Sequence, residues 1–241
     1  MTLSSGKRAL ITGASSGIGE ATALEFARAG IHVALVSRSE DKLEKVARSA
    51  QEHGVEAKSY PCDLARVEGV REQIETIATQ FGPIDILVNN AGMGYTGSLM
   101  ETSLADWQQV LDLNLTSVFE CVRGILPSMR ERRQGTIVNV ASIAGQQVFP
   151  NWGAYCVSKF GLMALSKTLA AEERERGIRV ITICPGAVNT SIWDTETVQA
   201  DFERSTMLTP QTVSQTILQT IELPQQAVIE ELTLMSNAGV L

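Results

Sequence analysis

The chain has 241 residues, of which 44% are hydrophobic and 20% are charged, a balance typical of a globular protein with a sizeable core. Its net charge of -7 argues against nucleic acid and anionic membranes as partners, because both attract basic surfaces. No segment approaches the ~18 consecutive apolar residues of a membrane span, and residues 1–7 are too short and polar for a signal peptide. We therefore expect a single domain over residues 1–241, located in the cytoplasm.

The cysteine and histidine pattern argues against a metal site. The cysteines form no C-x-x-C pair, and the two histidines, His32 and His53, are isolated from any cysteine cluster. We expect no metal, and four buried free thiols in a reducing compartment: Cys62, Cys121, Cys156 and Cys184.

Short apolar runs alternate with helical patterns along almost the whole chain. The apolar runs predict strands at 8–11, 32–36, 57–60, 84–88, 136–140, 180–183 and 227–232. The segments between them predict helices at 17–29, 40–53, 66–80, 103–132, 152–176 and 209–221. Because strand runs such as 86–88 are continuously apolar, they suit a sheet that is covered on both faces. The alternation predicts an α/β fold with a doubly wound parallel sheet.

The longest irregular segment, about 187–208, follows the sixth predicted strand. It is mostly polar, with isolated apolar residues such as Ile192 and Trp193. Long irregular segments in compact domains are commonly lids or binding loops, and an inert surface loop is the alternative. We expect this segment to cover a substrate, in a pocket sized by Phe149, Trp152 and Trp193.

A glycine-rich turn follows the first predicted strand. Its spacing differs from the G-x-G-x-x-G dinucleotide fingerprint, but the physical reasoning is the same. Glycines let the backbone turn sharply and let a pyrophosphate approach, and the helix that follows presents free N–H groups. The alternative is a tight connection with no ligand. We expect a nucleotide-binding turn made by Gly13, Ser15, Ser16, Gly17, Ile18 and Gly19.

The second predicted strand ends in Ser37 and Arg38, where a ribose-binding acid often stands. An arginine here favours contact with a 2′-phosphate over a solvated strand end. After the third strand, Asp63 and Leu64 stand where a carboxylate could meet an adenine amino group, although Asp63 could also cap a helix. After the fourth strand, small residues would let the backbone approach a ribose or would simply form a turn: Asn90, Ala91 and Gly92.

Asn114 lies on the apolar stripe of the predicted helix 103–132. A buried asparagine must find partners, since leaving it unpaired costs ~1–3 kcal/mol. Asn114 is therefore expected either to bridge a helix kink and bind an ordered water, or to be a satisfied polar group of the core.

Three residues could perform acid catalysis. Ser142 ends the fifth predicted strand, at the edge where ligands of open α/β sheets bind. Tyr155 and Lys159, four residues apart, share one face of the next helix. A free tyrosine titrates near ~10, and a neighbouring ammonium is expected to lower this pKa and bring the proton into use.

In six ordered motifs over nearly its whole length, the chain resembles the compact branch of the short-chain dehydrogenase/reductase family. The motifs are Thr12-Gly13-(x)3-Gly17-Ile18-Gly19, Asn89-Asn90-Ala91-Gly92, Asn114, Ser142, Tyr155-(x)3-Lys159 and Pro185-Gly186. The resemblance implies a Rossmann fold with NADP(H) as cofactor and Tyr155 as proton donor. It implies that Ser142 holds the substrate carbonyl, that Lys159 grips the nicotinamide ribose, and that Asn114 fixes a water. It also places four residues at the nicotinamide end: Pro185, Gly186, Val188 and Thr190.

The sequence is therefore interpreted as an NADP(H)-dependent oxidoreductase that interconverts a ketone and a secondary alcohol. Reduction of a 3-oxoacyl or related carbonyl substrate is the leading interpretation. Residues 229–234 lack the Val-Asp-Gly-Gly motif of many 3-oxoacyl-(acyl carrier protein) reductases, which favours a broader carbonyl reductase or a hydroxy-acid dehydrogenase over a dedicated fatty-acid enzyme. A dehydrogenase of a small polar 3-hydroxy acid and a non-catalytic NADP-binding regulator are the alternatives. Members of this family pair the two long helices, here predicted at 103–132 and 152–176, across a two-fold axis. The resemblance therefore also implies a homo-oligomer, with a tetramer favoured.

Overall fold

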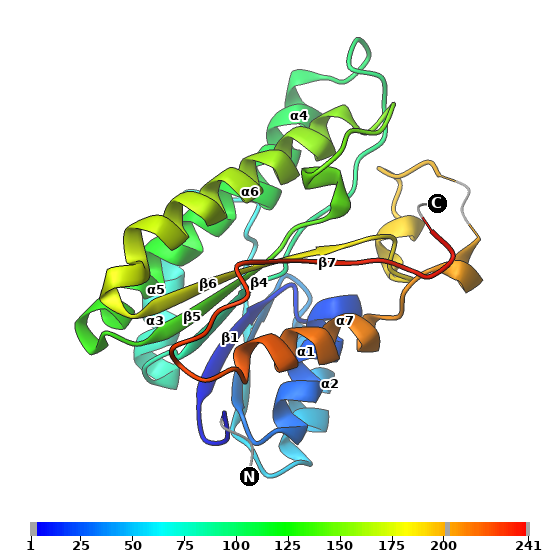
Figure 1. Cartoon of the computed structure of the whole chain (residues 1–241). Coiled ribbons are helices and arrows are strands. Elements are labelled where there is room, and N and C mark those ends of the chain that lie inside the picture. The colour runs from blue at the N-terminus through cyan, green and yellow to red at the C-terminus, as the bar shows by residue number, and fades with distance from the viewer. Residues whose placement is uncertain (1–3, 201–202, 240–241) are drawn as a thin grey trace.

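The computed structural model describes residues 4–200 and 203–239, whose strands form one parallel sheet (Figure 1). The strand order is β3-β2-β1-β4-β5-β6-β7, and every neighbouring pair is parallel. The strands are β1 Arg8–Thr12, β2 His32–Ser37, β3 Ala57–Pro61, β4 Ile86–Asn89, β5 Gly135–Val140, β6 Ile178–Pro185 and β7 Glu231–Leu234. The predicted doubly wound α/β sheet is confirmed.

Helices cover both faces of the sheet, because each central strand is apolar on both sides (Figure 1). One face packs against α1 Gly17–Arg28, α2 Glu40–Gln51 and α7 Pro210–Ile221. The other face packs against α3 Val70–Phe81, α5 Ser117–Arg132 and α6 Gly153–Glu173, with α4 Leu104–Leu111 beyond them. Alternate residues of β1 enter the two cores, Ala9 and Ile11 on one side and Leu10 on the other.

Two predicted helices differ from the structure. The third begins at Val70 and not at residue 66, after a left-handed Gly69 with φ of +87°. The predicted helix 103–132 is divided into α4 and α5 by a π-helical turn over Asp112–Thr116. A π-turn inserts an extra residue without ending the helix, so the apolar periodicity continues through it.

The last strand also differs, since β7 begins at Glu231 and the prediction placed it at 227–232. The cause is Arg179 of β6, which is buried. Its guanidinium donates to the carbonyls of Ile221, Leu223 and Ala227, and to Thr136 Oγ1. Burial lowers the pKa of Arg179, and the negative end of the α7 dipole offsets part of this cost. The backbone near Ala227 is thus held by an arginine and not by a strand.

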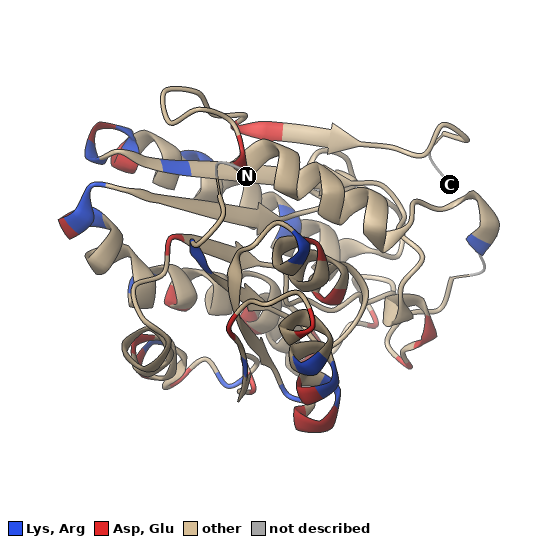
Figure 2. Ribbon diagram, turned by 90° about the horizontal axis from the view of Figure 1, so that it is seen from below, with Lys and Arg blue, Asp and Glu red and all other residues tan. Residues whose placement is uncertain are grey.

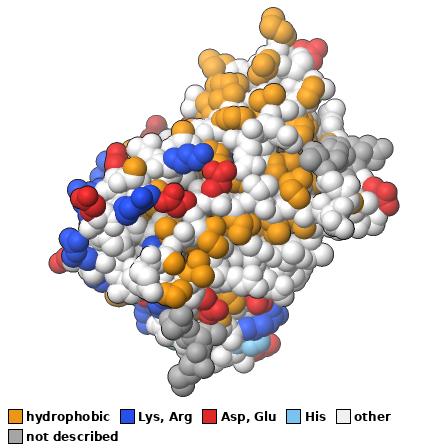
Figure 3. Space-filling view, viewed as in Figure 1, with side chains coloured by type: hydrophobic (Ala, Val, Ile, Leu, Met, Phe, Trp, Pro, Cys, Tyr) orange, Lys and Arg blue, Asp and Glu red, His pale blue; other side chains and the backbone are white. Residues whose placement is uncertain are grey.

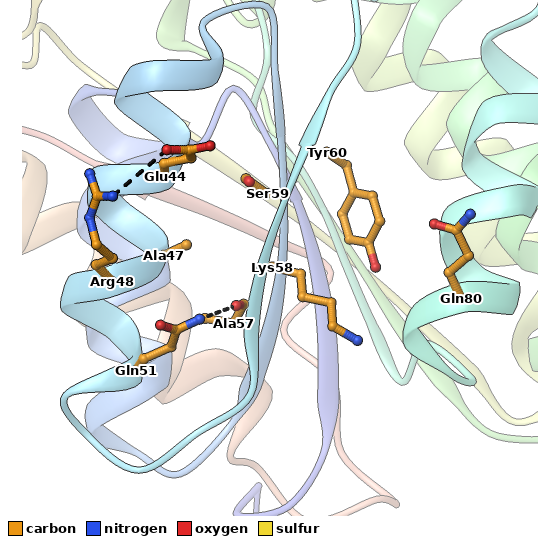
Figure 4. A pocket seen from close by; sticks show the side chains of 9 residues that line it. All are labelled: Glu44, Ala47, Arg48, Gln51, Ala57, Lys58, Ser59, Tyr60 and Gln80. Carbon is orange, nitrogen blue, oxygen red and sulfur yellow. Dashed lines mark hydrogen bonds and ion pairs between the residues drawn. The ribbon is translucent and has the colours of Figure 1, made fainter.

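An open groove of about 530 Å³ runs along the free edge of β3, between α2 and α3 (Figure 4). Within it, Gln51 Nε2 donates to the Ala57 carbonyl at 2.7 Å, and Arg48 lies 3.7 Å from Glu44. The groove follows the length of the edge strand, whereas ligands of open α/β sheets bind at the carboxyl ends of the strands. It is therefore separate from the candidate active site.

The position of the candidate site follows from the strand order. Strand β1 pairs with both β2 and β4, so the winding of the chain reverses between β1 and β4. Loops at such a reversal leave a crevice beyond the carboxyl ends of the strands.

Across the described ranges, no helix combines the length and apolarity needed to cross a membrane. Nor do three His, Cys, Asp or Glu side chains gather there to hold a metal, and the four cysteines are buried and free.

Candidate active site

The glycine-rich turn after β1 is shaped for close approach. Gly13 and Gly17 have φ of +65° and +58°, in the left-handed region that favours glycine. A side chain at Gly19 would overlap the carbonyl of Gly13. Ser16 precedes α1 without capping it through its side chain, so the first N–H groups of the helix stay available. Ser15 and Ile18, the other predicted residues of this turn, are partly exposed.

A hydroxyl joins this turn to the loop after β4. Thr12 Oγ1 accepts hydrogen bonds from the N–H groups of Asn90 and Ala91, both at 3.0 Å. Asn90 Nδ2 donates in turn to the carbonyls of Thr12 and Gly13, at 3.0 and 3.3 Å. A Cβ at Gly13 would lie 2.9 Å from Ala91 Cα, so only glycine allows the two loops to meet. This bridging role of Thr12 was not predicted, although the residue directly precedes the first glycine.

The ends of β2 and β3 continue the same edge. Ala14 N–H donates to Val36 O at 3.2 Å, and Cys62 N–H donates to Ser37 O at 2.9 Å. Arg38 is exposed at this edge, and none of the ion pairs found in the described ranges includes it. A guanidinium at the end of β2 is therefore free to meet a phosphate group.

Asp63 and Leu64 behave differently from the expectation. Asp63 does not cap a helix, because α3 begins only at Val70; its Oδ1 accepts from Ala65 N–H in a turn, at 3.2 Å. Its side chain is partly exposed, so it can still reach a ligand. The side chain of Leu64 is buried in the core. Only the backbone of Leu64 could therefore contact a cofactor.

Asn114 lies in the π-turn between α4 and α5 and is fully buried. Its Oδ1 accepts from Met93 N–H at 2.8 Å, and its Nδ2 donates to Met93 O at 2.9 Å and to Ser158 Oγ at 3.1 Å. The Asn114 side chain is thus a buried polar group with all its bonds made within the protein, as one expectation had it. It also lies at a helix irregularity, as the other had it. Ser158 Oγ donates to the carbonyl of Tyr155 at 2.7 Å. Ser158, which was not predicted as a site residue, therefore links Asn114 to the turn that carries Tyr155.

Ser142 and Tyr155 form the centre of the candidate site. Ser142 follows β5, and its Oγ accepts from Ala144 N–H at 3.1 Å, which leaves the hydroxyl proton free to donate. Burial raises the pKa of Tyr155, and a hydrogen bond with the Ser142 side chain offsets part of that increase. The expectation that this pKa is lowered is wrong for the ligand-free protein, because loss of water around the phenol outweighs the hydrogen bond with Ser142.

Lys159 lies close to Tyr155 without forming an ion pair with it. Its Nζ is 5.7 Å from the centre of the Tyr155 ring and donates to Val140 O at 3.0 Å. Burial lowers the pKa of Lys159 to about 8. A Cβ at Gly92 would lie 3.2 Å from Asn114 Oδ1 and 3.8 Å from Lys159 Nζ. The loop after β4, the π-turn and α6 therefore converge beside Tyr155.

The segment 187–208 returns to the same place; its residues 201 and 202 lie outside the described part. Thr190 Cγ2 would lie 3.0 Å from a Cβ at Gly17, so the segment touches the glycine-rich turn. Val188 pairs with Leu208 in a short parallel bridge. Pro185 ends β6, and Gly186 N–H donates to Leu234 O of β7 at 2.8 Å. Of the four residues predicted at the nicotinamide end, Pro185 ends β6, the other three follow it, and Thr190 lies beside the glycine-rich turn.

A family comparison agrees with this geometry. The sequence profile described as short chain dehydrogenase matches residues 7–201. The chain belongs to the short-chain dehydrogenase family. The predicted resemblance is confirmed.

Similar short-chain dehydrogenases include curated enzymes from two bacteria. The chain is 39% identical over 183 residues to a 3-oxoacyl-[acyl-carrier-protein] reductase of Staphylococcus epidermidis, a match that covers 76% of this chain and 75% of the relative. It is 37% identical over 202 residues to a 3-oxoacyl-[acyl-carrier-protein] reductase of Synechocystis, covering 83% of this chain and 81% of that one.

Solved short-chain dehydrogenase structures match over almost the full chain. An alcohol dehydrogenase of the archaeon Thermococcus sibiricus, complexed with 5-hydroxy-NADP, has a TM-score of 0.88 and 32% identity, with 97% of both chains covered. A single-substitution variant of actinorhodin polyketide ketoreductase with NADPH has a TM-score of 0.85 and 30% identity, with 98% of this chain and 97% of the other covered.

Proposed function

We propose that this short-chain dehydrogenase is an NADP(H)-dependent oxidoreductase that interconverts a ketone and a secondary alcohol. The observation that carries the proposal is the convergence of Ser142, Tyr155 and Lys159 beside the glycine-rich turn. The reductase relatives and the solved structures complexed with NADPH and 5-hydroxy-NADP support it. A 3-oxoacyl compound or another carbonyl compound is the proposed substrate class.

The residues present fit a dinucleotide. Side chains at Gly13 and Gly19 would overlap Asn90 or the Gly13 carbonyl, so these glycines let the turn pack closely against the loop after β4. The start of α1 has no side-chain cap there, so its N–H groups can bind an anion. In the proposed arrangement the start of α1 meets the pyrophosphate, while Arg38 and Ser37 meet the 2′-phosphate. Asp63 reaches the adenine end, and the loop at Asn90 approaches a ribose.

The chemistry divides between the cofactor and the protein. A bound reduced nicotinamide supplies a hydride for the carbonyl carbon. Ser142 is proposed to donate a hydrogen bond to the carbonyl oxygen, and Tyr155 to give that oxygen its proton. The raised pKa of Tyr155 keeps the hydroxyl protonated at neutral pH, which is the form that reduction requires. Lys159 is proposed to hold the nicotinamide ribose, and Asn114 to fix the π-turn beside it.

The segment 187–208 is proposed to act as a cover over the substrate. It is attached to the loop after β4 by Thr96 N–H, which donates to Thr197 O, and by Thr197 Oγ1, which donates to Gly94 O, both at 2.8 Å. Val198 is buried next to Gly94. A cover held by a few contacts can open for exchange and close during catalysis.

The proposed function is tested by mixing the purified protein with NADPH and a panel of ketones, 3-oxoacyl thioesters and oxo-acids. We expect NADPH consumption and a secondary alcohol with at least one carbonyl class, and a large loss of rate in Ser142→Ala. Tight NADPH binding with no turnover of any carbonyl compound would instead identify a non-catalytic regulator.

A homotetramer is also proposed. Apolar side chains are exposed on the helices of one face: Leu104 on α4, Phe119 on α5, and Val157 and Phe160 on α6. In Figure 3, hydrophobic side chains gather toward the end of the molecule where α4 lies. Patches of this kind on a globular protein commonly mark an interface between subunits.

We expect sedimentation to give about four times the 26.0 kDa mass of one chain. Phe119→Glu combined with Phe160→Glu should produce smaller species, because charges at a buried interface lose their water. The matched control is Val228→Glu, since Val228 is exposed but belongs to none of these helices. A 26.0 kDa particle at micromolar wild-type concentration rules out the tetramer.

A further inference from the structure

The rings of Tyr155, Trp152 and Trp193 form a row of edge-to-face contacts. The ring centres of Trp152 and Tyr155 are 5.5 Å apart at an interplanar angle of 67°, and those of Trp152 and Trp193 are 5.9 Å apart at 70°. Trp193 Nε1 donates to Val188 O at 2.8 Å. Because that donor is already engaged, Trp193 offers neighbouring groups an apolar ring and not a hydrogen bond.

Three chain segments come together around these rings: 92–103, 142–155 and 186–200. Gly97 N–H donates to Asn151 O at 2.7 Å, which joins the first segment to the second. The first and third are joined by the bonds of Thr197 to Thr96 and Gly94. Any substrate whose carbonyl meets Tyr155 is therefore bordered by residues of these three segments.

The three segments contain no lysine, arginine or histidine, although the whole chain has 20 Lys and Arg residues and two His. They do contain acidic residues: Glu101, Asp194 and Glu196. Arg204, the next cation along the chain, pairs with Asp194 at 3.0 Å. In Figure 2, most Lys and Arg lie toward the left and middle, and a basic segment also lies on the right below the C-terminus. These segments thus carry carboxylates and no cation of their own, and Arg204 reaches them only in its pair with Asp194.

The same segments expose apolar side chains. Leu99, Met100 and Val148 have exposed fractions of 64%, 95% and 74%. Leu99 also lies against Gly153, where a Cβ would overlap it, so it sits at the start of the helix that carries Tyr155. Apolar groups at this border favour an apolar substituent on the substrate.

A substrate carboxylate would find no cationic side chain in these three segments. Lys159, four residues beyond Tyr155 on α6, is buried and donates to Val140 O, and the proposed function assigns it to the cofactor. Transfer of a carboxylate from water to a site without a cationic partner costs free energy. Carboxylates of the protein nearby would also repel it. From these observations, and resting on the proposed function, we infer that the substrate is an uncharged ketone whose apolar group lies against Trp152 and Trp193. Carbonyl compounds with a carboxylate near the reacting carbon are rejected.

This inference separates the substrate classes that the sequence left open. An uncharged 3-oxoacyl ester or thioester, or an aryl ketone, places no charge beside the indoles. A small polar 3-hydroxy acid places its carboxylate within a few atoms of the reacting carbon, among these acidic segments. The hydroxy-acid alternative is therefore disfavoured by the charge of the site.

The test compares acetoacetamide with acetoacetate, which have nearly the same size and differ in charge next to the reacting carbonyl group. With NADPH and the wild-type protein, kcat/KM for the amide is expected to exceed that for the carboxylate by about tenfold or more. Equal values, or a preference for the carboxylate, would overturn the inference while leaving the proposed reductase activity intact. Turnover of neither compound, nor of any other ketone, would remove both.

A variant tests the apolar contact separately. Trp193→Ala is expected to raise KM about tenfold for acetophenone while changing it much less for butanone, since only the larger ketone reaches the indole. Trp107→Ala is the matched control, because Trp107 lies on α4 and belongs to none of the three segments. Equal effects of Trp193→Ala on both ketones would contradict the proposed placement.

Discussion

Replacing Tyr155 with phenylalanine should reduce kcat by about 10²–10⁴-fold, the range typical of a lost general acid. The substitution keeps the ring that contacts Trp152 and removes only the hydroxyl. The dissociation constant for NADPH should therefore stay close to that of the wild type. Single-turnover reduction and a separate binding titration measure the two quantities. Tyr60→Phe is the matched control, since Tyr60 lies in the edge groove away from the site.

The pH dependence of the reaction rate is a second test of the role of Tyr155. A proton donor works below its pKa, and burial raises the pKa of Tyr155, so reduction should persist through neutral pH. Oxidation of the alcohol needs the ionised phenol and should accelerate as pH rises. Lys159, with a pKa of about 8, loses its charge above that pH in the free protein, so cofactor affinity should weaken there. Wild-type rates in Tyr155→Phe would show that another group is the acid.

Cofactor choice should depend on the end of β2. We expect the wild type to prefer NADPH over NADH, and Ser37→Asp combined with Arg38→Ala to shift the ratio of kcat/KM values toward NADH by about 10- to 100-fold. The substitution removes the exposed guanidinium and introduces a carboxylate that repels a 2′-phosphate and accepts from a free 2′-hydroxyl. Steady-state kinetics with both cofactors measure the shift.

Two neighbouring carboxylates limit the expected preference without cancelling it. Glu40 and Asp41 lie in the first turn of α2, where the helix dipole favours them. Arg48→Ala is the control, because Arg48 is an exposed arginine further along the same helix that pairs with Glu44. A wild type that prefers NADH would refute the role given to Arg38.

Much of the fold could be predicted from the sequence because the central strands consist mainly of buried apolar residues. Strand β7 shows the limit. It lies at the edge of the sheet, with alternating exposure and two glutamates before and at its start, so its position depends on pairing with β6 and on the buried Arg179. The π-turn was indicated only by the polar Asn114 on an apolar stripe, because residues 103–132 otherwise keep a helical pattern and contain no proline or glycine near the irregularity.

The sequence indicated those candidate site residues whose chemistry and order along the chain are distinctive. It did not indicate residues whose role depends on the partners that the fold provides. Thr12 and Ser158 are ordinary hydroxyl residues whose importance comes from the partners that the fold provides. The predicted direction of the Tyr155 pKa shift was wrong, because the spacing of Tyr155 and Lys159 does not show how deeply the phenol is buried. Local spacing indicates which groups are near each other, whereas solvent exclusion depends on the whole fold.

The side chain of Gln51 makes the edge of the sheet a poor template for another strand. An unpaired edge exposes N–H and C=O groups to which a second chain could add, the usual first step of aggregation through β-structure. Here the Ala57 carbonyl is already occupied by Gln51, Lys58 places a charge on the same strand, and Pro61 at its end has no N–H. Removing this protection in Gln51→Ala would expose a hydrogen-bonding group at the sheet edge while leaving the distant reaction centre untouched. The geometry thus disfavours the addition of a second chain to this edge of the sheet.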